Sequence, residues 1–261
     1  MQNSRERPFD YTYDESFMRL AALSRQSAEL IIDLLRSAVP ITSVADFGCA
    51  LGTWLSAWRD AGVTDVIGID GGYVSLDKLQ IPRECFRQLD LGSAIRLGRR
   101  FDLVESLEVA EHLPEHAAGS LVASLVSHSD LVLFSAAPPG QGGENHLNEQ
   151  PYEYWRRKFQ EFDYKMLDWL RPQIRNATQI QYWYRYNLFL FVARERMRTL
   201  PSDLQRSAIK SGQRVQDVSP WPFRLRKQIV RRMPGRLQNR LSRAMTRFRT
   251  TCNGWPPFQR E

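Results

Sequence analysis

The stretch "ADFGCALGTW", residues 45–54, decides the fold. It joins the end of an apolar, strand-like run to the start of a helical pattern. Gly48, Ala50 and Gly52 stand two residues apart in it, and Asp46 comes just before them. Small residues in such a turn let a ligand approach the backbone closely. The other residues of the loop indicate which ligand that is.

The loop matches neither common phosphate-binding pattern. A P-loop ends in Gly-Lys-Ser/Thr, whereas Gly52 is followed by Thr53 and Trp54. The dinucleotide fingerprint needs a third glycine where Thr53 stands. A carboxylate at Asp46 would repel a pyrophosphate but attract an ammonium group. S-adenosylmethionine carries an ammonium and a sulfonium and no phosphate, so the pattern favours this cofactor.

Predicted strands and helices alternate along most of the chain. Short apolar runs predict strands over residues 43–48, 65–70, 85–91, 101–107 and 130–136. Helical spacing of apolar residues predicts helices over residues 15–38, 53–62, 114–129 and 152–162. Residues 179–194 read as two further strands, in a hairpin bent around Asn187. This order predicts an α/β fold with right-handed βαβ units and a mainly parallel sheet.

Acidic residues stand at the ends of successive predicted strands. Ligands of parallel sheets bind at the carboxyl ends of the strands. Asp70 ends the second strand and is suited to accept both hydroxyls of a ribose, while Asp90, near the end of the third, suits an adenine amino group. The predicted cofactor-binding residues are Asp46, Gly48, Ala50, Gly52, Asp70, Gly71, Asp90, Leu91 and Leu107.

Residues 15–193 resemble the class I S-adenosylmethionine-dependent methyltransferases. The motifs that carry the resemblance are "DFGCALGTWLSAW", "IGIDGGYV", "FDLVESLEVAEHLP", "SHSDLVLFSAAPPGQGGENHLNEQPYEYW" and "RYNLFLFV". They are most similar to bacterial methyltransferase-domain proteins of the small-molecule and surface-glycan type. Ala50 departs from the family pattern, which has glycine there. The resemblance implies a Rossmann-like three-layer sandwich around a seven-stranded, mainly parallel sheet with an antiparallel last strand.

The loop after the fifth strand is the predicted acceptor side. Residues 138–155, "PPGQGGENHLNEQPYEYW", combine glycines and prolines with a polar cluster. Histidine is the side chain whose charge ordinarily changes near neutral pH, so His146 is the predicted general base. Asn148, Gln150, Tyr154 and Trp155 are candidates for holding a sugar. The structural alternative is that His146 and Asn148 support the loop and that Trp155 packs in the core.

A second cluster raises the question of a metal. Glu108, Glu111 and His112 stand at i, i+3 and i+4, which predicts one helical face, and His146 is the natural fourth ligand. Some RNA 3′-end methyltransferases and quinone-pathway methyltransferases show a similar pattern with a divalent metal. The preferred interpretation is that Glu111 and His112 cap the loop and line the cofactor edge. Accordingly no metal ligand is assigned, and His112 joins His146 as a catalytic candidate.

Charge divides the chain near Ala193. Residues 194–261 carry 17 Lys/Arg and four Asp/Glu, whereas residues 1–193 carry 19 and 25. We therefore expect a methyltransferase domain over residues 1–193 and a basic, mainly helical extension over residues 194–261. In the extension, Leu237, Leu241, Met245 and Phe248 form an apolar stripe among arginines. The stripe predicts either docking on the domain or attachment to an anionic membrane or a protein partner. Nucleic acid is disfavoured, since no RNA-binding motif accompanies the arginines.

Three functions remain open at this stage. The preferred one is a methyltransferase of the EC 2.1.1 type that O-methylates a sugar, glycan or other small polar acceptor. The alternatives are a metal-dependent RNA 3′-end methyltransferase and a non-catalytic scaffold that retains the fold. Three widely spaced cysteines and the charged start "MQNSRERPFD" favour a reduced, cytoplasmic protein, peripheral at the membrane if the basic extension binds lipid.

Overall fold

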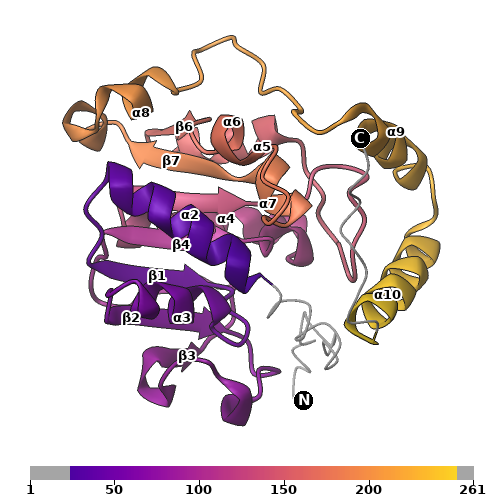
Figure 1. The fold of residues 1–261 in the computed structure, drawn as a ribbon, viewed down its shortest axis with the longest axis horizontal. Coiled ribbons are helices and arrows are strands. Elements are labelled where there is room, and N and C mark those ends of the chain that lie inside the picture. Colours follow the sequence, from indigo (N-terminus) through magenta and orange to yellow (C-terminus); the bar gives the residue numbers. More distant parts are fainter. Residues whose placement is uncertain (1–23, 252–261) are drawn as a thin grey trace, which may run out of the picture.

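The computed structural model describes residues 24–251, without the side chains of residues 236, 239 and 246–251. The first part of the predicted helix 15–38 and the side chain of Phe248 therefore lie outside the described residues. At the centre is a seven-stranded sheet in the order β3-β2-β1-β4-β5-β7-β6 (Figure 1). Its strands are β1 Ser43–Phe47, β2 Asp65–Asp70, β3 Phe86–Gln88, β4 Leu103–Leu107, β5 Leu131–Ser135, β6 Tyr164–Leu167 and β7 Phe189–Ala193.

The pairing of the strands confirms the predicted fold class. β1 pairs in parallel with both β2 and β4, β2 with β3, and β4 with β5. β7 enters between β5 and β6 and runs antiparallel to both. The last strand is thus the reversed one, as the sequence predicted, and the carboxyl ends of the parallel strands meet at one edge of the sheet.

Helices cover both faces of the sheet, which gives three layers (Figure 1). One apolar cluster packs α2 and α3 on the first face, with Trp58 and Leu55 fully buried in it. The other packs α4 and α5 on the second face, with Phe159 and Leu121 buried. The helices are α2 Arg25–Ala38, α3 Thr53–Asp60, α4 Ala118–His128, α5 Tyr152–Gln160, α6 Arg171–Ile174, α7 Tyr182–Asn187, α8 Ser202–Arg206, α9 Trp221–Val230 and α10 Gly235–Thr251. Short 3₁₀ helices are η1 Leu76–Lys78, η2 Arg83–Cys85, η3 Ala110–His112, η4 Glu115–Ala117 and η5 Arg196–Thr199.

The predicted hairpin over residues 179–194 is wrong in its first half. Residues 182–187 form α7, and only Phe189–Ala193 forms a strand. The reason lies in the sheet, because β5 and β6 occupy both edges of β7 and leave no place beside it for another strand. The antiparallel strand beside β7 on its outer edge is instead β6, Tyr164–Leu167, which the sequence analysis did not identify.

The sheet ends at Ala193, but the hydrophobic core does not. Leu200 and Leu204 are buried in the same cluster as α2 and α3. The chain then runs along β6, where the backbone N–H of Ile209 donates to Met166. Residues 194–209 are thus packed as part of the domain, and the extension that stands out from it begins near α9.

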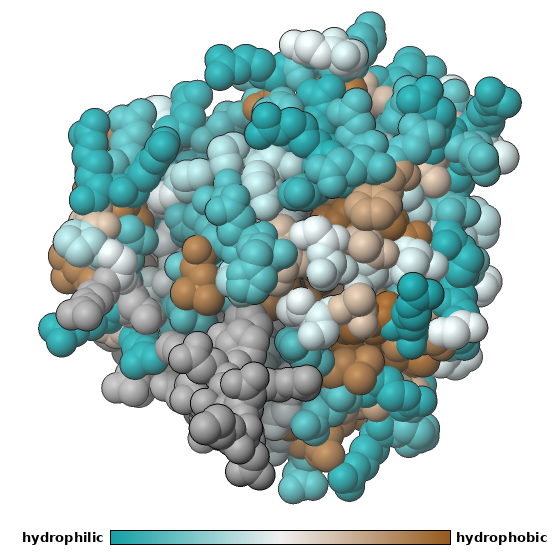
Figure 2. All heavy atoms as spheres, turned by 180° about the vertical axis from the view of Figure 1, so that it is seen from behind, coloured by the Kyte–Doolittle hydropathy of each residue, from teal (hydrophilic) through white to brown (hydrophobic). Residues whose placement is uncertain are grey.

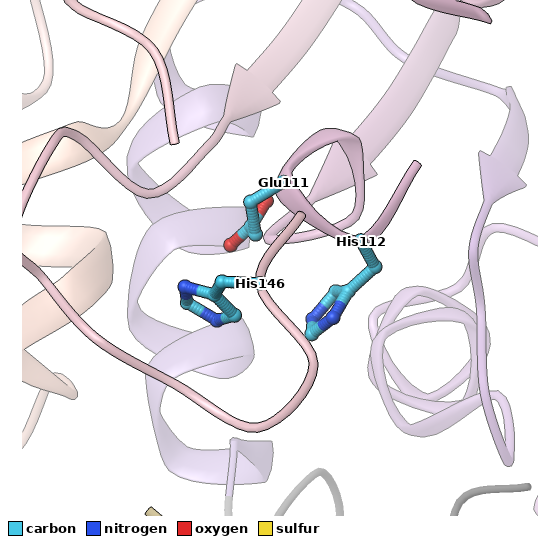
Figure 3. Close-up of side chains that lie close together, drawn as sticks. All are labelled: Glu111, His112 and His146. Atoms are coloured by element: carbon cyan, nitrogen blue, oxygen red, sulfur yellow. The ribbon is translucent and has the colours of Figure 1, made fainter. Parts of the chain in front are cut away.

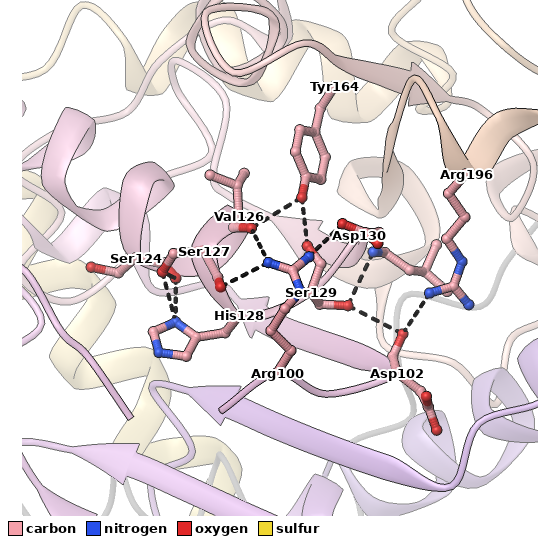
Figure 4. A network of polar contacts seen from close by, with 11 residues as sticks. Arg100, Asp102, Ser124, Val126, Ser127, His128, Ser129, Asp130, Tyr164 and Arg196 are labelled. Atoms are coloured by element: carbon pink, nitrogen blue, oxygen red, sulfur yellow. Dashed lines mark hydrogen bonds and ion pairs between the residues drawn. The ribbon is translucent and has the colours of Figure 1, made fainter. Parts of the chain in front are cut away.

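A polar network holds the amino-terminal edge of the sheet together (Figure 4). The Arg100 guanidinium pairs with Asp130 and donates to the Ser127 carbonyl at 2.8 Å. Buried His128 donates through Nδ1 to the Ser124 carbonyl at 2.6 Å and accepts through Nε2 from the Leu97 N–H at 2.9 Å. Both ring nitrogens of His128 are therefore used structurally, at the edge opposite to the predicted site. Among the described residues, no helix is both long and apolar enough to cross a membrane.

Candidate cofactor and acceptor site

The loop between β1 and α3 consists of alternating left-handed residues. Gly48, Ala50 and Gly52 have φ of 100°, 47° and 79°. A Cβ on Gly48 would overlap Val109, and one on Gly52 would lie 2.9 Å from Ile81. Ala50 shows that the middle position needs only a small residue, because the alanine methyl group is accommodated there at positive φ. The loop lies directly after the carboxyl end of β1.

Asp70 fastens this loop to the end of β2. Its Oδ2 accepts the backbone N–H of Ala50 at 2.7 Å, and its Oδ1 accepts the N–H of Gly71 at 2.7 Å and the hydroxyl of Tyr73. A carboxylate offers about four acceptor positions, so these three donors leave one open. Burial raises the pKa of Asp70, and the three hydrogen bonds oppose that rise. Tyr73, which the sequence analysis missed, therefore occupies part of the predicted ribose site.

Asp46 lies beneath the loop, beside a second buried acid. Asp46 and Glu105 are partners in the parallel pairing of β1 and β4, and Glu105 is fully buried. Trp58 donates its indole N–H to Glu105 Oε2 at 3.0 Å, whereas Oε1 has no hydrogen-bond partner. Burial raises the pKa of Glu105 to about 8 and, together with Glu105 and Asp70, raises the pKa of Asp46 well above its ordinary value. The acid that the sequence analysis read as an ammonium ligand is thus buried beside a second carboxyl group, an environment that favours the protonated form of both.

The remaining predicted cofactor residues lie at neighbouring strand ends. Asp90 is exposed just after β3, where it accepts the N–H of Gly92 at 2.9 Å and the hydroxyl of Ser93 at 2.8 Å. The preceding residue donates its N–H to the Asp70 carbonyl, so the ends of β2 and β3 are adjacent. Leu91 and Leu107 are nearly buried, at the end of β3 and of β4. The structure thus gathers the predicted residues along one edge.

The predicted Glu108–Glu111–His112 helical face does not form as one turn. Glu108 has φ of 56° and precedes η3, so it is not on one helical turn with Glu111 and His112, although its carboxylate stays close enough to raise the pKa of Glu111. Its carboxylate accepts from Gln141 at 2.8 Å and from Asn187 at 3.3 Å. Left-handed backbone at a residue other than glycine is strained and concentrates at functional sites. Here the strain aims Glu108 at the acceptor loop.

Glu111, His112 and His146 do come together (Figure 3). One ligand atom from each lies within 4.8 Å of the other two. Both carboxylate oxygens of the fully buried Glu111 lack a hydrogen-bond partner, and burial raises its pKa well above the ordinary value. Burial and the neighbouring His146 lower the pKa of His112 to about 3, so its imidazole is neutral. Two imidazoles and an unpaired carboxylate are a donor set that fits a divalent cation such as manganese or zinc.

His146 is oriented by a carboxylate that the sequence analysis missed. Its Nδ1 lies 2.8 Å from Glu149 Oε1, and Glu149 also accepts the backbone N–H groups of Gly140 and Gly142 at 2.7 Å. A Cβ on Gly143 would overlap the His146 ring, so a glycine there makes room for the imidazole. The i, i+3 spacing of His146 and Glu149 was the signal available in the sequence. With Nδ1 held by Glu149, Nε2 is the nitrogen left for other chemistry.

The other acceptor-loop candidates divide between the core and the site. Trp155 is 2% exposed, and its ring packs 5.2 Å from that of Phe134, which supports the structural alternative. Asn148 is buried, and its Oδ1 accepts from Gln150 at 2.9 Å. Its Nδ2 has no hydrogen-bond partner, as for the Glu111 carboxylate. The Glu111 carbonyl accepts from the N–H of Asn148 at 3.0 Å, so the two unpaired groups belong to adjoining segments.

α9 and α10 cover the outer side of the acceptor loop (Figure 1). Arg226 donates to the Gln141 carbonyl at 2.8 Å, and Arg243 forms an ion pair of 3.3 Å with the buried carboxylate of Glu144. A Cβ on Gly140 would overlap the carbonyl of Lys227. The predicted stripe residues Leu237, Leu241 and Met245 remain 43–46% exposed, so this stripe is not the docking face.

Comparison with known proteins identifies the fold. No protein-family model and no curated protein matches the chain. Among solved structures, DesVI of Streptomyces venezuelae aligns with a TM-score of 0.52 at 18% identity, over 70% of this chain and 100% of that one. Magnesium protoporphyrin IX methyltransferase (ChlM) from Synechocystis PCC 6803, solved with bound SAH, aligns with a TM-score of 0.51 at 17% identity, over 71% of this chain and 90% of that one. The same protein solved with bound SAM aligns with a TM-score of 0.50 at 18% identity, over 71% of this chain and 86% of that one. Together with the strand order and the loop after β1, these likenesses show that the chain has the fold of the class I S-adenosylmethionine-dependent methyltransferases.

Proposed function

We propose that this protein transfers the methyl group of S-adenosylmethionine to a sugar or another small polar acceptor. The observation that carries the proposal is the left-handed loop of Gly48, Ala50 and Gly52, fastened by Asp70 at the carboxyl edge of a parallel sheet. A likeness in fold to a methyltransferase solved with bound SAM supports it. A side chain at Gly48 or Gly52 would collide with Val109 or Ile81, so these positions admit only small residues, and the acids replace the basic groups that a phosphate would need.

The residues at the carboxyl edge fit the parts of this cofactor. The loop backbone and the Asp46–Glu105 pair would face its charged amino acid part, and Asp70 would accept its ribose hydroxyls. Leu91 and Leu107 would line its adenine ring, and Asp90 its amino group. Bound there, the cofactor supplies an electrophilic methyl group on sulfur, and the protein has to align an acceptor atom with it.

The acceptor end of the site supports oxygen methylation. Glu149 would hold the proton on Nδ1 of His146, which leaves Nε2 to accept the proton of an acceptor hydroxyl as the new C–O bond forms. The neutral imidazole of His112 lies edge-on against His146, with ring centres 4.9 Å apart. Asn148 adds an unpaired amide donor for a polar acceptor.

A metal-dependent form of the reaction is a second candidate, and a specific observation favours it. Both oxygens of Glu111 are buried and unpaired, and they lie beside His112 and His146. In this form the three residues would hold a divalent cation, and Glu108 would support it from across the loop. Such a cation would bind the acceptor hydroxyl and lower its pKa. This form also keeps the RNA 3′-end alternative open.

Labelled methyl transfer tests the proposal. The full-length protein is incubated with S-adenosylmethionine carrying a radiolabelled methyl group and with extract separated into small-molecule, glycan and RNA fractions. We expect label in the small-molecule or glycan fraction, and less of it with His146→Ala, while the exposed control His116→Ala behaves as wild type. Label in RNA alone, removed by EDTA and restored by manganese, would replace the proposal by its metal-dependent alternative. If the protein binds the cofactor but no fraction becomes labelled, the result would contradict methyl transfer and favour a non-catalytic binding protein.

A further inference from the structure

Among residues 24–251, the polar and aromatic contacts that hold α9 to the domain come from one side of the helix. The Phe223 ring lies 5.2 Å from that of Tyr182 and 5.7 Å from that of Tyr186. Arg226 donates to the Gln141 carbonyl, and Lys227 pairs with Asp217. At 3.6 residues per turn, these three positions share one side of the helix. This side of α9 therefore faces the described part of the domain.

The opposite side of α9 is apolar and exposed. Trp221, Leu225 and Ile229 stand at i, i+4 and i+8 and are 69%, 49% and 50% exposed. Exposed apolar stripes of this length are uncommon on a helix with no further partner. The described part of the domain covers the side of α9 that carries Phe223, Arg226 and Lys227, and it leaves the stripe of Trp221, Leu225 and Ile229 exposed.

α10 repeats the arrangement. Leu237, Leu241 and Met245 have the same spacing and are 45%, 46% and 43% exposed. The contacts of α10 come from other positions, since Gln238 donates to the carbonyls of Val230 and Met233, and Arg243 pairs with Glu144. In Figure 2, which shows the molecule from behind, apolar side chains stand among hydrophilic ones towards the left side, to which α9 and α10 turn in that view.

The charge around the two stripes has one sign. Residues 218–251 contain ten Lys/Arg and no Asp/Glu. Among the described side chains, those of Arg224, Arg231, Arg232 and Arg240 are exposed. A helix that is apolar on one side, rich in arginine beside it and supplied with a tryptophan has the composition that binds in the plane of an anionic bilayer. Arginines close to such a surface add electrostatic attraction to the anionic lipids.

We propose that α9 and α10 form a binding surface for an anionic lipid membrane. The stripes Trp221/Leu225/Ile229 and Leu237/Leu241/Met245 enter the headgroup region, and the arginines contact the lipid phosphates. Because the same helices hold the acceptor loop through Gln141 and Glu144, binding places this loop next to the membrane. The inference rests on the surface of the extension, so it stands or falls separately from the proposed methyl transfer.

Sedimentation of the full-length protein with vesicles tests this surface. We expect binding to phosphatidylcholine vesicles that contain phosphatidylglycerol, little binding to pure phosphatidylcholine, and weaker binding as salt rises, since screening acts within ~10 Å at 0.1 M salt. Leu225→Ser with Ile229→Ser should weaken binding about tenfold or more, because each apolar side chain loses its burial in lipid. The matched control, Leu30→Ser with Phe162→Ser, replaces apolar residues that are exposed elsewhere and should bind as wild type.

Charge reversal gives the second arm. Arg231→Glu with Arg232→Glu should abolish binding at low salt, whereas Arg175→Glu with Arg198→Glu makes the same charge change outside the two helices and should retain most of it. Unchanged circular dichroism and melting temperature establish that each variant is folded. A full-length protein that ignores phosphatidylglycerol vesicles at low salt would overturn the proposal. So would stripe variants that bind like their controls, or a stripe that instead mediates self-association measured by light scattering without vesicles.

Discussion

The carboxylate of Asp70 accepts a 2.7 Å hydrogen bond from the backbone N–H of Ala50, so the acid that ends β2 holds the loop that follows β1. Ala50 has positive φ, which a residue with a Cβ adopts at a cost. One side chain therefore shapes the cofactor loop and also offers the acceptor atoms for a ribose. Replacing Asp70 should therefore disturb the conformation of the loop and also remove the acceptor atoms for the ribose.

Tyr73→Phe should strengthen cofactor binding. The Tyr73 hydroxyl occupies an acceptor position on Asp70, and a ribose with two hydroxyls needs that position as well as the one left open. Removing a competing hydrogen bond of about 0.5–1.5 kcal/mol should lower the Kd for S-adenosylhomocysteine by roughly two- to tenfold. Calorimetry measures this, with Tyr154→Phe on α5 as the control. Weaker binding by Tyr73→Phe would mean that the hydroxyl contacts the cofactor itself.

Glu105→Gln should change how stability depends on pH. The folded pKa of Glu105, about 8, lies above its ordinary value of 4.5, so the folded state retains a proton that the unfolded chain releases. The wild type therefore loses stability as pH rises from about 4.5 to about 8, by an amount on the order of 5 kcal/mol at ~1.4 kcal/mol per pKa unit. Glutamine keeps an acceptor for Trp58 and cannot ionise. The free energy of unfolding of Glu105→Gln, relative to that of the wild type, should therefore increase between pH 5 and pH 8.

Urea unfolding at both pH values measures this difference. The control is Glu115→Gln, which replaces an exposed glutamate on η4 and should follow the wild type at both. An equal effect of Glu105→Gln at pH 5 and pH 8 would show that Glu105 is ionised in the folded protein.

His146→Ala should reduce kcat while cofactor binding survives. A positioned general base contributes ~10²–10⁴ in rate, and His146 lies on the acceptor loop rather than on the cofactor loop. Glu149→Gln should also reduce kcat, since Glu149 orients the imidazole, but it should cost stability as well because it anchors Gly140 and Gly142.

EDTA separates this base from the metal-dependent alternative. If His146 acts as a base, EDTA leaves the rate unchanged. If Glu111, His112 and His146 hold a cation, EDTA abolishes methyl transfer by the wild-type protein and added manganese restores it. Glu111→Gln should then lack this transfer whether or not manganese is added.

Two truncations should separate the core from the basic extension. Deletion from residue 194 removes Leu200 and Leu204, which are 5% and 0% exposed, and should lower the melting temperature or cause aggregation. Each buried leucine contributes about 1.5–3 kcal/mol of transfer free energy. Deletion from residue 220 keeps both leucines and should leave a folded protein that binds cofactor. Differential scanning fluorimetry compares the two, and equal melting temperatures would contradict the packing of residues 194–209.

β1, β2 and β4 were predictable because each is a short apolar run that ends at, or is followed directly by, glycine or an acid. Asp46 and Asp70 followed from the same rule. β6 was missed, since "YKML" is only four residues long and has no flanking glycine. The alternating aromatic residues of 182–186 indicated a strand, but long-range pairing by β5 and β6 leaves α7 to form there. No local pattern marks Tyr73 as a partner of Asp70, because that contact depends on how the loop after β2 folds back.

Isothermal titration of the full-length protein with S-adenosylhomocysteine tests the central claim most directly. We predict saturable binding to a single site, no heat with NAD⁺, and a loss of about 1–3 kcal/mol of binding free energy in Asp70→Ala, since charge-assisted hydrogen bonds and the loop anchor are both removed. Asp77→Ala, at an acid of η1 that is not fully buried, is the control and should bind as wild type. Absence of S-adenosylhomocysteine binding, or an Asp70→Ala variant that binds as tightly as wild type, would contradict the account.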